Sequence, residues 1–87
     1  FEVSLHPKGR LPQGIQRTYI KLLTFIRSAK DERDLHSNPG YRFKKLKGNR
    51  KHQCAFRLND QYRLIVELQQ TDTDTVVHIV DIEDYHK

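Results

Sequence analysis

The chain has 87 residues, which is enough for one domain with a modest core and excludes a multi-domain arrangement. It carries 16 Lys and Arg against 11 Asp and Glu, and no apolar run approaches the roughly 20 residues of a membrane span. The first ten residues lack the apolar centre of a signal peptide, and the single cysteine, Cys54, cannot form an internal disulfide. We therefore expect residues 1–87 to form one cytoplasmic domain.

The first third of the chain predicts a strand and then a helix. Alternating Phe1, Val3 and Leu5 indicate a short strand that ends at the turn formers Pro7 and Gly9. Beyond Pro12, which suits the first turn of a helix, apolar residues recur at helical spacing. They are Ile15, Tyr19, Leu22, Leu23, Ile26 and Ala29. This stripe predicts a helix with one face in the core.

The rest of the chain predicts mainly strands. Residues 31–36 suggest one short helix, and Asn38, Pro39 and Gly40 have the chemistry of a turn. Four segments that favour strands follow, at residues 42–47, 53–59, 61–69 and 75–82. The polar stretch QQTDTD before the last of them indicates a turn.

The register of the hairpin CAFRLNDQYRLIVEL follows from its alternation. A sheet with one buried face needs the apolar residues of both strands on the same side, and only an odd loop length achieves that. A loop of residues 59–61 pairs Leu58 with Tyr62 and Phe56 with Leu64, and it places Arg57 opposite Arg63. Opposed arginines repel. Either both splay into water or pair with Glu67 and Glu83, or an anion binds between them.

A strongly basic stretch, FKKLKGNRKH at residues 43–52, precedes this hairpin. Residues 1–59 contain 14 basic and 4 acidic side chains, residues 60–87 contain 2 and 7, and residues 35–59 contain no acid. On a strand, Lys45 and Lys47 share one face, and Lys44 and Leu46 share the other. A lysine-rich edge protects a sheet against edge-to-edge pairing. Together with Arg57 and Arg63, however, the stretch forms the basic surface typical of nucleic-acid binding.

The last residues carry groups that transfer protons. Strand TVVHIVDI is followed by EDYHK, so Asp84, Tyr85 and His86 stand at its end. These residues either form a functional cluster for proton transfer or belong to a frayed C-terminal tail. The five histidines lack metal-ligand spacing, and we expect neither a metal nor a cofactor. His52 is expected at the surface, His78 packed or paired in a strand, and Cys54 in the core.

Taken together, LKGNRKHQCAFRLNDQYRLIVEL and EDYH resemble the RelE/ParE superfamily of bacterial type II toxins, and most closely its HigB branch. The resemblance covers nearly the whole chain. It implies a small α+β fold with an antiparallel or mixed sheet packed against one long N-terminal helix or two. It also implies a metal-independent endoribonuclease that cuts mRNA on the ribosome by 2′-hydroxyl attack. The segment HPKGRLPQG is short for the first of two family helices.

The resemblance assigns roles to individual positions. Lys47 of LKG corresponds to a lysine at the scissile phosphate, Arg57 to an arginine that faces the transition state, and Arg63 to the arginine of YR. Lys44 stands where HigB-like sequences often carry a histidine. The catalytic residues implied are Lys47, Arg57, Asp84, Tyr85 and His86. The RNA-binding residues implied are Lys44, Lys45, Arg50, Lys51 and Arg63.

The partners implied are a cognate antitoxin, the ribosome and mRNA, with operator DNA bound only through the antitoxin complex and no membrane. Two other functions remain open. One is a ParE-like toxin that poisons DNA gyrase by protein contact. The other is an RNA-binding module of the same fold that cuts nothing, whose affinity would fall steeply with salt.

Overall fold

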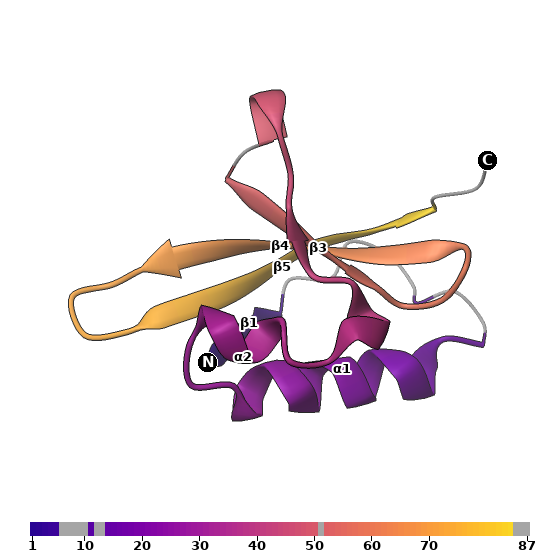
Figure 1. Ribbon diagram of the computed structural model, residues 1–87, viewed down its shortest axis with the longest axis horizontal. Helices are drawn as coiled ribbons and strands as arrows, with labels where there is room; N and C mark the ends of the chain where they lie inside the picture. Colours follow the sequence, from indigo (N-terminus) through magenta and orange to yellow (C-terminus); the bar gives the residue numbers. More distant parts are fainter. Residues whose placement is uncertain (6–10, 12–13, 51, 85–87) are drawn as a thin grey trace.

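The computed structural model describes residues 1–5, 11, 14–50 and 52–84, and it consists of one five-stranded sheet with a helix packed against it (Figure 1). The strand order is β1-β5-β4-β3-β2. Strand β1 (Glu2–Leu5) runs parallel to β5 (Thr75–Asp84), and the other neighbouring strands are antiparallel. The sheet is therefore mixed, and the predicted α+β class is confirmed.

Helix α1 (Gln16–Ser28) confirms the predicted helical stripe. Its buried side chains are Tyr19, Leu22, Leu23 and Ile26. Each such side chain contributes about 1.5–3 kcal/mol to folding when it is fully buried. Pro12, expected in the first helical turn, lies outside the described residues. Because one face of α1 is apolar, the helix covers one side of the sheet; the other side carries the buried Ala55 and Ile65 together with charged side chains.

Two short segments connect α1 to the sheet. Helix α2 (Glu32–Leu35) lies within the predicted range 31–36, and the carboxylate of Asp31 caps it by accepting a 3.2 Å hydrogen bond from the Asp34 amide. The 3₁₀ turn η1 (Pro39–Tyr41) confirms the predicted turn, and Asn38 Oδ1 accepts a 2.9 Å hydrogen bond from the Gly40 amide.

The hairpin of β3 (Gln53–Arg57) and β4 (Tyr62–Gln70) has the predicted register. Phe56 pairs with Leu64, and Arg57 with Arg63. The Leu58 amide donates a 2.9 Å hydrogen bond to the Tyr62 carbonyl, so the loop has the predicted three residues. The burial of Phe56 and Leu64, both fully buried, decides this register because a shift of one residue would expose them.

The strand predicted over residues 42–47 is wrong at both ends. Strand β2 contains only Lys44–Lys45. Before it, Arg42 has left-handed backbone angles (φ 46°, ψ 47°), and after Leu46 the chain turns into the 3₁₀ segment η2 (Gly48–Arg50). The Leu46 amide still donates to the Gln53 carbonyl at 3.0 Å. Lys47 therefore lies in the turn and not on a strand.

The core lies between α1 and the sheet. Side chains of α1 pack there against the apolar face of the sheet, together with Leu35 and Phe43. The sheet side chains in this cluster are Cys54, Phe56, Leu58, Leu64, Val66, Val77 and Ile79. None of the helices in the described part of the chain has the length and apolar composition of a membrane span.

Candidate nucleic-acid interface

The face of the sheet that points away from α1, here called the outer face, carries a row of charged side chains. Successive strand residues alternate between faces, so Arg57 points opposite to the core residue Phe56. Arg57 stands opposite Arg63 in the register, and Arg63 stands opposite Glu83 of β5. Two cations and one anion therefore lie side by side across three strands.

Arg57 forms an ion pair with Asp60 in the β3–β4 loop, through Nη2 and Oδ1. The arginine side chain is 31% exposed and the aspartate side chain 98%. Glu67 and Glu83 were the carboxylates considered from the sequence, and neither holds Arg57. The nearest acid in sequence takes that place because the loop turns back beside the end of β3.

Asn59 builds the β3–β4 loop. Its Oδ1 accepts hydrogen bonds from the backbone amides of Gln61 at 2.8 Å and Tyr62 at 2.7 Å. Asparagine is suited to this task because its short side chain reaches backbone donors two and three residues ahead. The loop conformation therefore rests on Asn59, while the Asp60 carboxylate projects into solvent.

Arg50 connects η2 to the last strand. Its guanidinium contacts both carboxylate oxygens of Glu83, at 2.6 Å through Nη2 and 3.3 Å through Nη1, and its Nε donates to Gln53 Oε1 at 3.0 Å. A bidentate pair restrains direction as well as distance. The tie holds residues 44–50, here called the basic arm, against β5. Figure 1 shows the arm projecting beyond the sheet, away from α1.

Lys47 lies on this arm directly before Gly48. The lysine is exposed, and Gly48 has φ +68°, a left-handed conformation that a residue with a Cβ adopts only under strain. No atom lies within 4 Å of the position a Cβ would occupy, so the backbone angle and not the available space calls for glycine. This accounts physically for the glycine of LKG.

The two lysines of β2 point to opposite faces. Lys44 pairs with Ala55 and lies on the outer face with Arg57, whereas Lys45 pairs with the core residue Cys54. Lys45 Nζ forms a 3.1 Å ion pair with Glu32 of α2. The expectation that Lys45 shares a face with Lys47 on a continuous strand is therefore wrong, because the strand ends at Lys45.

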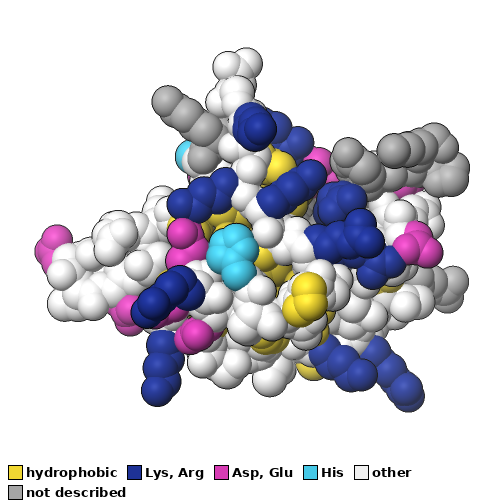
Figure 2. All heavy atoms as spheres, in the orientation of Figure 1, with side chains coloured by type: hydrophobic (Ala, Val, Ile, Leu, Met, Phe, Trp, Pro, Cys, Tyr) yellow, Lys and Arg dark blue, Asp and Glu magenta, His cyan; other side chains and the backbone are white. Residues whose placement is uncertain are grey.

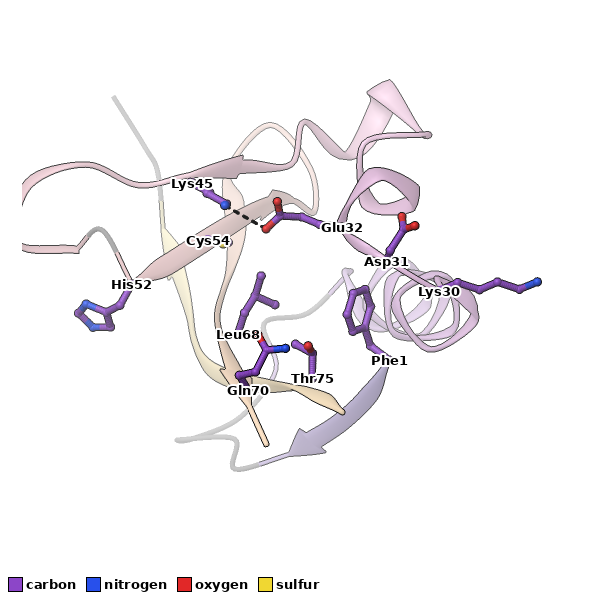
Figure 3. A pocket seen from close by; sticks show the side chains of 10 residues that line it. All are labelled: Phe1, Lys30, Asp31, Glu32, Lys45, His52, Cys54, Leu68, Gln70 and Thr75. Atoms are coloured by element: carbon purple, nitrogen blue, oxygen red, sulfur yellow. Dashed lines mark ion pairs between the residues drawn. The ribbon is translucent and has the colours of Figure 1, made fainter. Parts of the chain in front are cut away.

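Lys45 borders a hollow of about 490 Å³ on the helix side of the sheet, shown in Figure 3. Its lining combines apolar, polar and charged side chains from strands β2 to β5, from α2, from the link between α1 and α2, and from the residues directly before β1 and β3. The lining residues are Phe1, Lys30, Asp31, Glu32, Lys45, His52, Cys54, Leu68, Gln70 and Thr75. In Figure 3 the Lys45–Glu32 ion pair lies at one side of the hollow, and His52 points away from it.

Cys54 and His52 have the environments predicted for them. Cys54 is buried, and burial raises the pKa of its thiol, with the Glu32 carboxylate adding to the rise and Lys45 opposing it. The raised pKa leaves little thiolate at neutral pH, which suits a core side chain and not a nucleophile. His52 is exposed, and its Nε2 lies 3.9 Å from Glu67 Oε1. Within the described residues, no group of three His, Cys, Asp or Glu side chains could hold a metal ion.

The predicted catalytic residues are only partly within the described chain. Asp84 is the last residue of β5, is exposed, and accepts a 3.2 Å hydrogen bond from Gln61 Nε2 of the β3–β4 loop. This contact brings the end of β5 beside the loop that carries Asp60. Tyr85, His86 and Lys51 lie outside the described residues.

Basic side chains dominate part of the molecular surface. Figure 2 shows Lys and Arg crowded over the middle and right of the view, where Figure 1 draws β2 and the turn between β3 and β4. These segments all come from the acid-free stretch at residues 35–59 or its immediate neighbours. The basic half of the sequence therefore remains a basic region after folding.

Sequence reasoning missed two acidic residues of this face. The sequence assigns Asp60 only to a loop, and it offers Glu83 as a partner of Arg57 or Arg63 and not of Arg50. A signal for Asp60 was present, since an acid three residues after Arg57 across a tight loop can return to its side chain. No such signal announces the Arg50–Glu83 tie, which joins residues 33 positions apart.

Comparisons with known proteins agree with this fold and with these motifs. The model of the HigB-like toxin family, described as the RelE-like toxin of type II toxin-antitoxin system HigB, matches residues 6–86. Toxin HigB-1 of Vibrio cholerae serotype O1 is 40% identical over 57 residues, which are 66% of this chain and 60% of that toxin. The chain thus spans less than two thirds of the length of this curated relative.

A solved structure, the YoeB/ParE toxin from Agrobacterium tumefaciens, superposes with a TM-score of 0.60 and covers 85% of this chain and 81% of its own. At 18% identity this likeness shows the fold alone. The family match covers nearly all of the chain and includes LKG and the arginine hairpin, which confirms the resemblance seen in the sequence. The chain belongs to the HigB-like family of RelE-like toxins of type II toxin-antitoxin systems.

Proposed function

We propose that this chain is a ribosome-dependent mRNA endoribonuclease that stops translation by metal-independent cleavage of the message. The observation that carries the proposal is the pair of opposed arginines, Arg57 and Arg63, on the outer face of a HigB-like chain. Two cations held side by side by backbone register make a ready site for the phosphodiester of RNA. The end of β5, which leads to the proposed terminal cluster, lies beside the same loop.

The chemistry requires four events at one phosphate. The 2′-hydroxyl loses its proton, its oxygen attacks the adjacent phosphorus, negative charge builds up on the phosphate oxygens, and the 5′ oxygen leaves with a proton. Lys47 and Arg57 stabilise the charge. In catalytic sites, one preorganised contact of this kind contributes roughly 2.7–4 kcal/mol, or about 10²–10³ in rate.

The terminal cluster handles the protons. His86 transfers a proton, because a histidine titrates near neutral pH. Asp84 either orients His86 or acts as the base, and Tyr85 positions the nucleotide. The exposed position of Asp84 beside Gln61 supports a role at the surface, where a bound message would lie.

Further cations bind the flanking phosphates of the message. Lys44 and Arg63 share the outer face with Arg57, and this placement supports them as RNA contacts. Arg50, and Lys51 next to it in the chain, belong to the same proposed set, with Arg50 already paired to Glu83. The family resemblance also implies Lys45 as an RNA contact, but its ion pair with Glu32 on the helix side of the sheet gives that assignment no geometric support.

The proposed partners follow from the family and the charge. A type II toxin implies a cognate antitoxin, and we expect acidic residues of that antitoxin to meet the basic arm. The ribosome presents the message to the outer face. Operator DNA is bound only through the toxin–antitoxin complex.

Primer extension on a reporter mRNA translated in vitro tests the proposal. The wild-type protein should cut at codon-spaced positions, only on translated message, and Lys47→Ala, Arg57→Ala and His86→Ala should each lower cleavage about 10²–10³-fold. Arg33→Ala is the matched control, because this arginine is 93% exposed on α2. Its cleavage should equal that of the wild type.

Unchanged cleavage by all three site variants would contradict the proposed catalytic site. An intact message in the presence of wild-type protein would overturn the proposed activity. The next assay would then be supercoiling by DNA gyrase, which a ParE-like toxin inhibits.

A further inference from the structure

A carboxylate occupies the place in the proposed site where the substrate would bring its phosphate. We propose that Asp60 is an internal competitor of the substrate phosphate, which holds Arg57 in the free protein and is displaced when RNA binds. The inference rests on the proposed function for the identity of the ligand, a single-stranded RNA phosphodiester. It makes Asp60 a determinant of how tightly the outer face binds RNA.

The guanidinium of Arg57 is stabilised by a nearby anion whether or not RNA is present. Arg57 and Arg63 stand directly opposite each other, and Arg57 is only 31% exposed, so water screens its charge incompletely. Asp60 provides this anion from within the chain. A phosphate oxygen carries the same charge and accepts the same hydrogen bonds, so it can take the place of the carboxylate.

The Asp60 side chain can leave without disturbing the loop. Asn59 makes the hydrogen bonds to the Gln61 and Tyr62 amides, and the Leu58 amide bonds to the Tyr62 carbonyl. The Asp60 side chain is 98% exposed, so rotation away from Arg57 returns the carboxylate to water and opens no cavity. The contact is therefore exchangeable.

The contact is also limited in extent. Asp60 reaches Arg57 through one nitrogen, Nη2. A guanidinium has five N–H donors in a planar fork and can bind a phosphate through two parallel hydrogen bonds. The incoming phosphate can thus make a better contact than the carboxylate that it replaces.

Glu83 provides the contrast on the same face. It binds Arg50 through both carboxylate oxygens, and its side chain is 36% exposed, far less than that of Asp60. The two-point contact of Arg50 with Glu83 therefore fixes the position of the basic arm. The one-point contact of Arg57 with the exposed Asp60 can instead separate when another anion binds Arg57.

Binding of an uncleavable RNA isolates this effect from catalysis. The probe is a short fluorescein-labelled oligoribonucleotide with 2′-O-methyl groups, which lacks the attacking hydroxyl, and its affinity is measured by fluorescence anisotropy. Asp60→Asn should bind about two- to fivefold more tightly than the wild type at low salt. The slope of log affinity against log salt should become steeper, by up to about 0.7, the contribution of one phosphate contact on a single strand.

Asp72→Asn is the matched control. It removes the same charge from the exposed turn between β4 and β5, away from the β3–β4 loop, so it reports the effect of net charge alone. The gain of Asp60→Asn should exceed that of Asp72→Asn, and it should disappear in an Arg57→Ala background, where no guanidinium remains to be released. Equal melting temperatures of Asp60→Asn and the wild type would show that the fold is intact.

Three results would overturn the inference. They are equal effects of Asp60→Asn and Asp72→Asn, a gain that survives in Arg57→Ala, and no binding of the probe by either wild type or Asp60→Asn. Failure of the proposed function looks different, because it leaves the translated message uncut while the affinity shift of Asp60→Asn persists.

Discussion

At the scale of the residue, the role of an arginine side chain depends on the carboxylate with which it pairs. Arg50 and Arg57 both pair with acids, but Glu83 grips Arg50 at two points from the neighbouring strand, and Asp60 touches Arg57 at one point from an open loop. Asp31 shows a third use, since its carboxylate caps a helix and takes its hydrogen bond from a backbone amide.

The cap at Asp31 predicts a pH dependence of stability. The hydrogen bond from the Asp34 amide is the main cause that lowers the pKa of Asp31 below its ordinary 3.8; desolvation opposes it, and Arg33 adds to the lowering. A pKa lowered by folding adds stability that is complete above the unfolded-state pKa and is lost as the pH falls through the folded-state value.

We therefore expect Asp31→Asn, which still caps the helix but carries no titrating group, to be less stable than the wild type at neutral pH. The difference should shrink as the pH falls below 3.8. Urea unfolding followed by circular dichroism at a series of pH values measures it. A difference that stays constant down to the lowest pH would contradict the role of the charge.

The sequence predicted the positions of side chains that are fixed by burial. It did not predict which acidic residue pairs with a given arginine. Cys54 was placed in the core and Phe56 opposite Leu64, because only one register buries them. The partner of Arg57 was not found. The sequence offers several acidic residues as partners of Arg57, and which of them forms the ion pair depends on the path of the three-residue loop.

At the scale of the element, the basic arm depends on a tie to a distant strand. Strand β2 has only two residues and both are exposed, so burial contributes little to its position. The Arg50–Glu83 pair, the Lys45–Glu32 pair and the hydrogen bond from the Leu46 amide to the Gln53 carbonyl hold it instead. The strand length was mispredicted for the same reason, since a run of lysines has no apolar alternation that marks its ends.

Loss of this tie should loosen the arm. In Glu83→Gln we expect faster hydrogen exchange at the amides of Leu46 and Arg50, and a loss of stability of about 0.5–1 kcal/mol, which is modest because the pair is partly exposed. Hydrogen-exchange mass spectrometry on peptides that cover residues 44–50 measures the change.

Glu67→Gln is the control on the same sheet, because its contact with His52 is long, at 3.9 Å. It should leave exchange in the arm unchanged. Equal exchange in Glu83→Gln and the wild type would show that the arm is held by other contacts.

At the scale of the whole molecule, charge is separated between the two parts of the chain. Residues 1–59 hold most of the cations and residues 60–87 most of the anions. The sheet brings β5 from the acidic part next to β4, so acids such as Glu83 reach the basic residues of the arm and outer face. The order of strands, and the parallel place of β1, could not be read from local patterns because both depend on contacts between distant segments.

The net charge of +5 predicts that a polyanion stabilises the fold. Heparin at low salt should raise the melting temperature, because it binds the folded basic surface and relieves repulsion among its cations. The gain should vanish as sodium chloride approaches about 1 M, where the screening length falls to about 3 Å. Differential scanning fluorimetry measures it, with neutral dextran as the control. An equal shift with dextran would contradict an electrostatic cause.

The place of β5 in the strand order also bears on the timing of synthesis. Strand β1 joins the sheet through β5, and β5 in turn lies between β1 and β4. A ribosome makes β1 before β5, and it must add residues 75–84 before β1 has its neighbouring strand to pair with. The growing chain therefore waits, with its first strand unpaired and its outer face incomplete, until the last strand emerges. Assembly of this sheet therefore cannot be completed until residues 75–84 have been translated.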